Sequence, residues 1–275
     1  MAVLLKGAPV ATAITESLIL RREALNQKGI SPKLAILRIG EGESDLAYER
    51  AAMKRCEKIG IEVTGIILPD KAPEDAVLAE IEKINRDPSI HGCLMFRPLP
   101  RHLNEHRICE ALAPEKDVDC MTEKSLVHVF TGSGTGFAPC TAESCIEILD
   151  HYGFDPSGKN VAVIGRSLVI GKPVSMLLQS RNATVTMCHS RAVGTAEICR
   201  TKDIVVVAAG HAGILTRDYT NPDQVIIDVG INVDASGNMS GDADFNDVEP
   251  VCKAITPVPG GVGSVTTAVL CKHLI

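Results

Sequence analysis

Short apolar segments of strand length alternate along this chain with longer segments of helical periodicity. In the first half, strand-like runs at 34–39, 61–68 and 92–95 are separated by helical patterns at 44–59 and 73–86. The second half repeats the alternation, with strand-like runs at 161–164, 183–188, 203–208 and 225–229 and helical segments at 171–179 and 193–200. Strands that alternate with helices build mostly parallel sheets covered on both faces, so the pattern predicts an α/β fold.

A glycine-rich segment divides the two halves. Residues 131–136 read Thr-Gly-Ser-Gly-Thr-Gly, and Pro139 follows shortly after. Such a run is typical of a flexible connection. A chain of 275 residues is long enough for two modest domains, because domains usually span about 100–200 residues. We place a linker here, followed by a connecting helix at 143–152, and expect a last helix from about Ser264 after a second glycine-rich loop at 257–263.

Composition excludes several classes of function. The net charge is −6 and aromatic residues make up 3% with no Trp, so neither a global attraction for nucleic acid or anionic membranes nor an aromatic stacking platform is expected. No run approaches the roughly 18 apolar residues of a membrane span. The first 30 residues are interrupted by charges and do not read as a signal peptide. The ten cysteines include no CxxC pair or zinc-site spacing, which favours reduced, mostly buried thiols in a cytoplasmic protein without a metal site.

The turn after the strand at 161–164 is a candidate anion site. Gly165 and Gly171 flank it and Pro173 suits the first turn of the helix that follows. Backbone N–H groups and the helix dipole converge at such a turn and attract phosphate. The middle glycine of the usual GxGxxG fingerprint is missing, so a tight turn without a ligand remains an alternative.

The end of the next strand bears on the choice of dinucleotide. NAD-binding folds usually carry Asp or Glu there to hold the ribose 2′-hydroxyl. Here the strand at 183–188 is followed by His189, Ser190 and Arg191, and Arg166 lies in the preceding turn. Two arginines and a serine without an acid suit a 2′-phosphate, so the sequence favours NADP. The alternative is that Arg191 merely faces solvent.

Tyr48 lies in the predicted helix at 44–59, for which Ser44 is a plausible N-cap and Gly60 a stop. A lysine four residues after a tyrosine would share its helix face and could lower the tyrosine pKa. That position holds Ala52. Lys54, six residues on, lies about 240° around the helix and is read as a solvated lysine.

Six motifs stand in order along the chain and together resemble the methylenetetrahydrofolate dehydrogenase/cyclohydrolase family over residues 1–275. They are Ser44-x-x-Ala47-Tyr48, Pro98-Leu99-Pro100, Pro114-Glu115-Lys116-Asp117-Val118-Asp119, Gly165-Arg166-Ser167-x-x-x-Gly171-x-Pro173, Cys188-His189-Ser190-Arg191 and Thr256-Pro257-Val258-Pro259-Gly260-Gly261-Val262-Gly263.

The resemblance implies a homodimer of two-domain subunits with an active-site cleft between the domains. Residues 1–136, completed by the helix at 264–275, would hold the folate, and residues 140–255 would form a Rossmann-type, doubly wound NADP-binding domain. Family members oxidise 5,10-methylenetetrahydrofolate to 5,10-methenyltetrahydrofolate, and most then hydrolyse that product to 10-formyltetrahydrofolate at the same site.

The resemblance also implies roles for individual residues. Tyr48 would stack on or orient the pterin and Asp119, rather than the turn-capping Asp117, would bind its polar edge; both would serve catalysis. Further folate contacts would come from Leu99, Pro259, Gly260 and Gly261. Cofactor contacts would come from Gly165, Arg166, Ser167, Gly171, Pro173, His189, Ser190, Arg191, Ala209, Gly210 and Ile231.

The chain departs from the family at the position of its catalytic lysine, which is Ala52, and of the partnering glutamine, which is Phe96. Three smaller departures are Cys120 for Gly, and Ala142 and Ser264 for Pro. Hydrolysis needs a general acid–base group, whereas hydride transfer depends mainly on positioning. We therefore expect an NADP-dependent dehydrogenase without cyclohydrolase activity.

Three alternatives remain open. The chain could be bifunctional, with Arg97 or Lys54 recruited in place of the lysine. It could be a folate- or nucleotide-binding paralogue without activity. It could also be a related enzyme that acts on another one-carbon carrier.

Overall fold

The computed structural model describes all 275 residues and forms two compact units. One comprises Ala13–Cys140 with Thr267–Ile275, and the other Met1–Thr12 with Thr141–Thr266. The folate domain was expected to begin at residue 1, whereas Met1–Thr12 belong to the other unit. Strand β1 (Val3–Leu4) pairs in parallel with β11 (Ala254–Ile255), which attaches the first residues to the second unit. Strands of two residues show no periodicity, so the sequence could not indicate this pairing.

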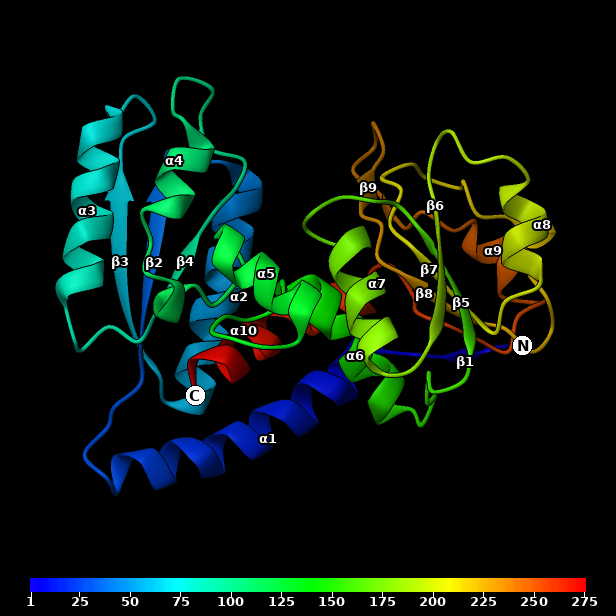
Figure 1. Cartoon of the computed structure of the whole chain (residues 1–275), viewed down its shortest axis with the longest axis horizontal. Coiled ribbons are helices and arrows are strands. Elements are labelled where there is room, and N and C mark those ends of the chain that lie inside the picture. Colours follow the sequence, from blue (N-terminus) through cyan, green and yellow to red (C-terminus); the bar gives the residue numbers. More distant parts are fainter. The chain divides into compact units, whose positions relative to one another are not determined.

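The Ala13–Cys140 unit contains a three-stranded parallel sheet in the order β3-β2-β4 (Figure 1). Its elements are β2 (Lys33–Ile39), α2 (Glu43–Ile59), β3 (Glu62–Leu68), α3 (Glu74–Arg86), β4 (Gly92–Met95), α4 (Glu105–Glu110), the 3-10 turn η1 (Pro114–Lys116) and α5 (Glu123–Thr131). Val77, Ile81 and Ile84 recur at helical spacing on α3 and pack with Ile108 of α4 in one core cluster on the sheet. These elements confirm the predicted alternation.

Helix α2 carries Tyr48 and differs from the prediction at its start. Its N-cap is Gly42, with no side-chain cap, and Ser44 is already the second helical residue, so Ser44 does not cap the helix as expected. Glu43 and Asp45 in the first turn stabilise this end through the helix dipole. The end agrees with the prediction, because Gly60 adopts the left-handed conformation, with φ of 85°.

One helix lies near each end of the chain. Helix α1 (Gly7–Asn26) was not predicted, because its low amphipathicity leaves no clear apolar face. Helix α10 (Thr266–Leu274) follows the 3-10 turn η3 (Val262–Ser264) and confirms the expected last helix. Its Cys271 lies with Sγ 3.8 Å from Sγ of Cys56 on α2.

The other unit is built on a six-stranded parallel sheet in the order β1-β11-β8-β7-β5-β6. Its elements are α6 (Cys140–His151), β5 (Asn160–Ile164), α7 (Gly171–Ser180), β6 (Thr184–Cys188), α8 (Thr195–Arg200), β7 (Ile204–Val207), η2 (Arg217–Tyr219), β8 (Val225–Asp228), β9 (Asn232–Val233), β10 (Met239–Ser240), α9 (Phe245–Val248) and β11. The chain crosses from β6 at one side of β5 to β7 at the other, which confirms the doubly wound fold.

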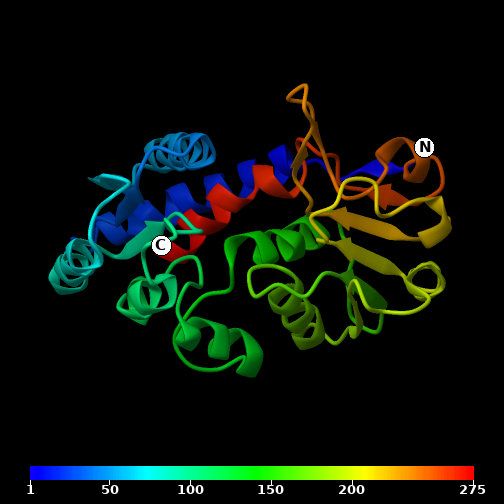
Figure 2. The same cartoon turned by 90° about the horizontal axis from the view of Figure 1, so that it is seen from above.

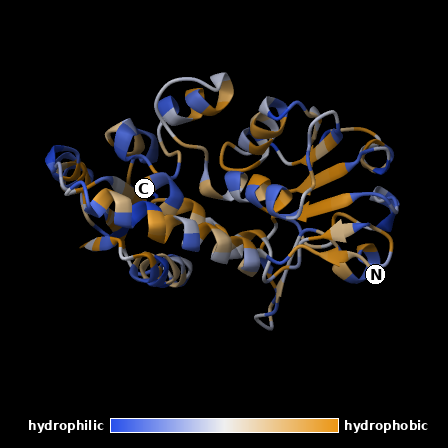
Figure 3. Ribbon diagram, turned by 90° about the horizontal axis from the view of Figure 1, so that it is seen from below, coloured by the Kyte–Doolittle hydropathy of each residue, from blue (hydrophilic) through white to orange (hydrophobic).

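Helices cover both faces of this sheet. Figure 1 shows α6 and α7 on one side of the strands and α8 and α9 on the other. Cys199 of α8 and Val248 of α9 share a buried cluster with Val205 of β7 and Ile226 of β8. The central strands are mainly hydrophobic, as Figure 3 shows, whereas the helices alternate between hydrophobic and hydrophilic residues.

Strands β9 and β10 form a short antiparallel hairpin that projects from the body of this unit (Figure 2). Its tip is a local turn in which Asp234 accepts hydrogen bonds from the backbone N–H of Ser236 and Asn238. The hairpin returns the chain to Gly241 and Asp242 beside the carboxyl end of β8.

All ten cysteines are buried and no disulfide is present, in agreement with the expectation of buried thiols. Desolvation raises the pKa of most of these thiols; that of Cys93 is raised to about 12. No helix combines the length and apolarity needed to cross a lipid bilayer.

Candidate functional site

The candidate cofactor residues follow the carboxyl ends of four neighbouring strands. Ile164 at the end of β5 pairs with Cys188 of β6 and with Val207 of β7, and Val207 pairs with Asp228 of β8. The segments that leave these strands therefore share one edge of the sheet. Ligands of doubly wound folds bind at this edge, where the strand order reverses. The register thus brings together the expected residues at 165–167, 189–191, 209–210 and 231.

The turn after β5 is tightly built. Gly165 has φ of 128°, and a Cβ there would overlap the carbonyl of Ala208, while a Cβ on Gly171 would overlap the carbonyl of Gly165. The hydroxyl of Ser167 accepts hydrogen bonds from the backbone N–H of Ile170 (3.1 Å) and, more weakly, Gly171 (3.4 Å). At both positions a backbone carbonyl lies too close for any side chain, so only glycine fits. The turn therefore keeps its shape without the middle glycine of the usual fingerprint.

Arg166, Ser190 and Arg191 are exposed on the two loops that leave β5 and β6. Neither guanidinium forms a salt bridge. His189 shapes the second loop, because its Nδ1 lies 3.2 Å from the N–H of Arg191 and accepts from it. Two uncompensated cations and a hydroxyl fit the 2′-phosphate of NADP, and no carboxylate lies there to hold a 2′-hydroxyl.

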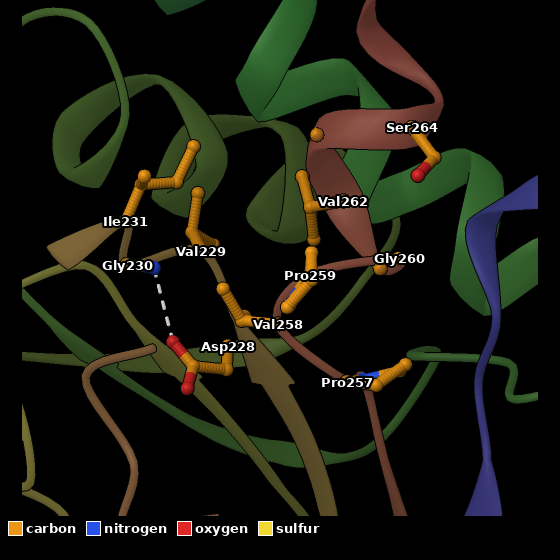
Figure 4. A pocket seen from close by; sticks show the side chains of 12 residues that line it. Asp228, Val229, Gly230, Ile231, Pro257, Val258, Pro259, Gly260, Val262 and Ser264 are labelled. Atoms are coloured by element: carbon orange, nitrogen blue, oxygen red, sulfur yellow. Dashed lines mark hydrogen bonds between the residues drawn. The ribbon is translucent and has the colours of Figure 1, made fainter. Parts of the chain in front are cut away.

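The glycine-rich loop after β11 lines a pocket together with the end of β8. Figure 4 shows Val229, Ile231, Val258 and Pro259 around it, with Asp228 at its base. Ile231 is exposed, as are Pro259 and Gly260. Ile231, an expected cofactor contact, therefore lies beside Pro259–Gly261, which are expected folate contacts.

In the other unit, the structure brings Tyr48 and Phe96 into contact. Their ring centroids are 6.1 Å apart and their planes meet at 81°, an edge-to-face arrangement. Ala52, one helical turn after Tyr48, is fully buried. Leu99 is also buried, and Tyr48 and Phe96 are half-buried. At the positions where the resemblance implies a lysine and a glutamine, the chain therefore has a buried methyl group and an apolar ring.

The two cations considered as substitutes differ in placement. Lys54 is exposed on α2, as its position around the helix predicted. Arg97 follows Phe96 and is half-buried, and its charge partly opposes the rise in pKa that burial causes at the Asp119 carboxyl. A guanidinium stays protonated at any physiological pH, so Arg97 can stabilise negative charge but cannot take up a proton.

Asp119 is half-buried and oriented by Cys140. Its Oδ1 accepts a hydrogen bond of 3.0 Å from the backbone N–H of Cys140. Burial raises the pKa of the Asp119 carboxyl, and the Cys140 N–H and the charge of Arg97 oppose this effect. Cys120, which follows, has φ of 57°, a left-handed conformation that glycine adopts with less strain, in line with the glycine that the resemblance implies at this position.

Asp117 has a structural role, in agreement with its reading as a turn cap. It is fully buried and accepts hydrogen bonds from the backbone N–H groups of Met121 and Thr122 and from the hydroxyls of Thr122 and Ser125, at 2.7–2.9 Å. Because the carboxylate is completely buried among these donors, it is not accessible to a ligand.

Asp228 and Asp242 were not identified from the sequence. Both are buried beside the candidate cofactor loops, at 3% and 0% exposure. The available signal was Asp228 itself, a carboxylate that ends the otherwise apolar run Val225–Ile227. No group of three or more His, Cys, Asp or Glu side chains is arranged to hold a metal ion.

Comparison with known proteins identifies both units. Residues 5–119 match the family described as "Tetrahydrofolate dehydrogenase/cyclohydrolase, catalytic domain", and residues 139–275 match its "NAD(P)-binding domain". The chain is 48% identical over 275 residues to "Bifunctional protein FolD" of Alkaliphilus oremlandii, which covers 100% of this chain and 96% of that protein.

Solved structures agree with this result. The bifunctional methylenetetrahydrofolate dehydrogenase/cyclohydrolase of Campylobacter jejuni is 34% identical, with a TM-score of 0.96 over 100% of this chain and 97% of its own. The enzyme of Trypanosoma brucei, solved with NADP cofactor and an inhibitor, is 32% identical, with a TM-score of 0.93 over 99% of this chain and 96% of its own.

Proposed function

This chain belongs to the tetrahydrofolate dehydrogenase/cyclohydrolase family, and from that premise we propose that it oxidises 5,10-methylenetetrahydrofolate to 5,10-methenyltetrahydrofolate with NADP and does not hydrolyse the product. The contact between Phe96 and Tyr48 carries the second half of the proposal. The first half rests on family membership and on the candidate residues that the chain retains.

NADP, when bound, supplies the acceptor for the hydride that leaves the methylene carbon. The chain's own residues bind and orient. Arg166, Ser190 and Arg191 would hold the 2′-phosphate through charge-assisted hydrogen bonds, and the turn from Gly165 to Gly171 would receive the pyrophosphate at the start of α7. Neither exposed guanidinium is neutralised by a carboxylate, which supports a phosphate ligand over a 2′-hydroxyl.

Tyr48 and Asp119 would bind the folate. The ring of Tyr48 offers an apolar face and a phenolic hydroxyl to a pterin. The carboxylate of Asp119 accepts hydrogen bonds, and the amino and ring N–H groups of a pterin are a matching pair of donors. Asp119 is half-buried and already fixed by Cys140, so little side-chain entropy would be lost on binding.

Hydride transfer does not require a proton shuttle at this site. The product cation is stabilised by its own resonance, and holding the two carbons at reaction distance supplies much of the rate. Hydrolysis does require proton transfers, because water must lose a proton and the leaving nitrogen must gain one. Ala52 has no ionisable group and Phe96 cannot orient one, so the two positions that the resemblance gives to a lysine and a glutamine supply no general base.

A bifunctional enzyme is the second candidate, because the relative at 48% identity carries that description. On the chain itself, Arg97 favours it only as a fixed positive charge near Asp119, since a guanidinium cannot act as the base. We also propose, from the family, that the protein is a cytoplasmic homodimer.

One assay separates these candidates. The purified protein is incubated with methylenetetrahydrofolate and NADP at neutral pH, and reduced nicotinamide and methenyl product are separated and quantified without acidification, because acid would convert any formyl product back to the methenyl compound. Equal accumulation of both compounds supports the proposal. Reduced nicotinamide without lasting methenyl product supports a bifunctional enzyme, and binding without turnover supports a non-catalytic paralogue.

A further inference from the structure

Two carboxylates are buried together at the carboxyl edge of the six-stranded sheet without a cation. Asp228 ends β8 and Asp242 follows the β9–β10 hairpin, and their exposure is 3% and 0%. The backbone N–H of Asp242 donates to Oδ1 of Asp228 at 3.0 Å, so the two residues are directly linked. Neither forms a salt bridge. Burying a carboxylate without a neighbouring cation costs free energy, so the hydrogen bonds that this pair makes need to compensate that cost.

Asp228 connects the end of β8 to the chain that follows the hairpin and to β11. Its carboxylate accepts hydrogen bonds from the N–H of Gly230 (2.9 Å, dashed in Figure 4) and of Ala243 (2.8 Å). Its own N–H donates to the hydroxyl of Thr256 at 2.7 Å, immediately before the glycine-rich loop. Asp228 also lines the pocket formed by that loop.

Asp242 holds the segment after β7. Its Oδ2 accepts hydrogen bonds from the N–H groups of Ala209 (2.6 Å) and Gly210 (2.8 Å). Its Oδ1 accepts from the side-chain amide of Asn232 at 2.9 Å, one residue after Ile231. The two carboxylates therefore hold the loops after β7 and β8, and the backbone N–H of Asp228 attaches the loop after β11.

The backbone encloses both carboxylates closely. A Cβ on Gly230 would overlap the carboxylate of Asp242, and a Cβ on Gly241 would overlap that of Asp228. The hydrogen bonds are thus made in a dry, close-packed environment, where they are strong and where charge is weakly screened.

We propose that Asp228 and Asp242 are positioning residues for the cofactor, which orient the loops after β7, β8 and β11 around the nicotinamide and favour its oxidised, positively charged form. This inference rests on the proposed function only in taking NADP as the ligand. Hydride uptake removes the positive charge of the nicotinamide ring. A buried negative charge beside the ring therefore stabilises the oxidised cofactor relative to the reduced one.

Binding measurements without folate test the proposal. NADPH affinity is measured by its fluorescence and NADP⁺ affinity by competition, on the unmodified protein and on Asp228→Asn and Asp242→Asn. We expect the affinity for NADP⁺ to fall about tenfold or more in each variant, and that for NADPH to fall clearly less.

Two further variants distinguish positioning from loss of stability. Asp242→Asn combined with Asn232→Asp restores a carboxylate–amide pair with the roles exchanged, and should recover part of the NADP⁺ affinity. Asp234→Asn, on the exposed tip of the same hairpin, is the matched control and should bind both forms as the unmodified protein does.

Unchanged affinities in Asp242→Asn, with a lower melting temperature alone, would overturn the proposal. Equal weakening of both cofactor forms without recovery in the double variant would overturn it as well. This test is separate from the test of the proposed function. If the protein shows this binding pattern but does not oxidise methylenetetrahydrofolate, the proposed activity is refuted and the positioning role still holds.

Discussion

The ring of Phe96 meets the ring of Tyr48 edge-on, at 6.1 Å between centroids. Phe96 is the position at which the family resemblance implies a glutamine, and the position at which it implies a lysine is the fully buried Ala52. Phe96 contacts Tyr48, which lies one helical turn before Ala52, although positions 52 and 96 are 44 residues apart in the chain (96 − 52). Under the proposed function, the two replacements would remove hydrolysis and leave the side chains proposed to bind folate in place.

Restoring both replaced residues should restore hydrolysis. Ala52→Lys alone should restore little, because an ammonium at a fully buried position beside Phe96 would be desolvated and its pKa would fall. Ala52→Lys with Phe96→Gln should restore more than the sum of the single changes, since the two groups act as a unit. The measurement is decay of methenyltetrahydrofolate against a buffer blank.

Acid–base assistance is typically worth about 10²–10⁴-fold, so the gain should be easy to detect. Lys54→Ala, which removes an exposed lysine from the same helix, should change neither reaction. Enzyme-dependent decay in the unmodified protein at a rate near its dehydrogenase turnover would refute the monofunctional interpretation and direct attention to Arg97.

Arg166→Ala should abolish most of the preference for NADP over NAD. A charge-assisted hydrogen bond is worth about 1.5–3 kcal/mol, and 1.4 kcal/mol corresponds to a factor of ten, so we expect at least about a tenfold preference in the unmodified enzyme. The measurement is kcat/KM for both cofactors. Lys159→Ala removes an exposed cation next to the amino end of β5 and should leave the ratio unchanged. Equal kcat/KM values in the unmodified enzyme would contradict the assignment of a 2′-phosphate site.

Asp119→Ala should weaken folate use strongly and leave NADP affinity nearly intact. The change removes the acceptor proposed for the pterin N–H groups, whereas the cofactor loops belong to the other unit. KM for methylenetetrahydrofolate and the dissociation constant of NADPH are measured in parallel. Glu115→Ala, an exposed carboxylate close by in sequence, is the control. Loss of affinity for both ligands would instead indicate a structural role for Asp119.

Asp117→Ala should lower the free energy of unfolding by about 3 kcal/mol or more. It would leave several buried donors without an acceptor, and each unsatisfied group costs about 1–3 kcal/mol. Chemical denaturation at constant pH measures this change. A loss below about 1 kcal/mol, similar to that of an exposed position, would show that water replaces the carboxylate.

Asp228 should make stability depend on pH in a characteristic direction. Burial raises the pKa of Asp228 to about 6. The N–H groups of Ala243, Asp242 and Gly230 oppose this rise, and the neighbouring charge of Asp242 adds to it. The folded state therefore holds a proton between about pH 4 and 6 that the unfolded state has lost, and the stability from this group falls as pH rises through that window.

The comparison of the unmodified protein with Asp228→Asn isolates this contribution. At one pKa unit per 1.36 kcal/mol, the difference in unfolding free energy should change by up to about 3 kcal/mol between pH 4 and pH 7. The unmodified protein should lose stability relative to the variant as pH rises. A constant difference across this range would show that Asp228 has an ordinary pKa.

Local patterns in the chain determined the class of fold and many of the candidate residues. Apolar runs such as Val161–Ile164 and helical spacing such as Val77, Ile81 and Ile84 are short-range signals, because strand and helix periods express themselves within a few residues. The Gly165–Gly171 turn and the segment His189–Arg191 were located for the same reason. Each lies directly after a strand whose end the sequence marks.

Only the tertiary structure decided which distant side chains meet. The pairing of Val3 with Ala254 spans nearly the whole chain, and no local pattern indicates it. Asp117 and Asp119 occur in one short motif, so the sequence does not separate their roles. Their different hydrogen-bond donors in the structure mark Asp117 as structural and leave Asp119 as the candidate ligand-binding carboxylate. The Asp228–Asp242 pair depends on backbone N–H groups from three loops, whose directions are set by long-range packing rather than by neighbouring residues.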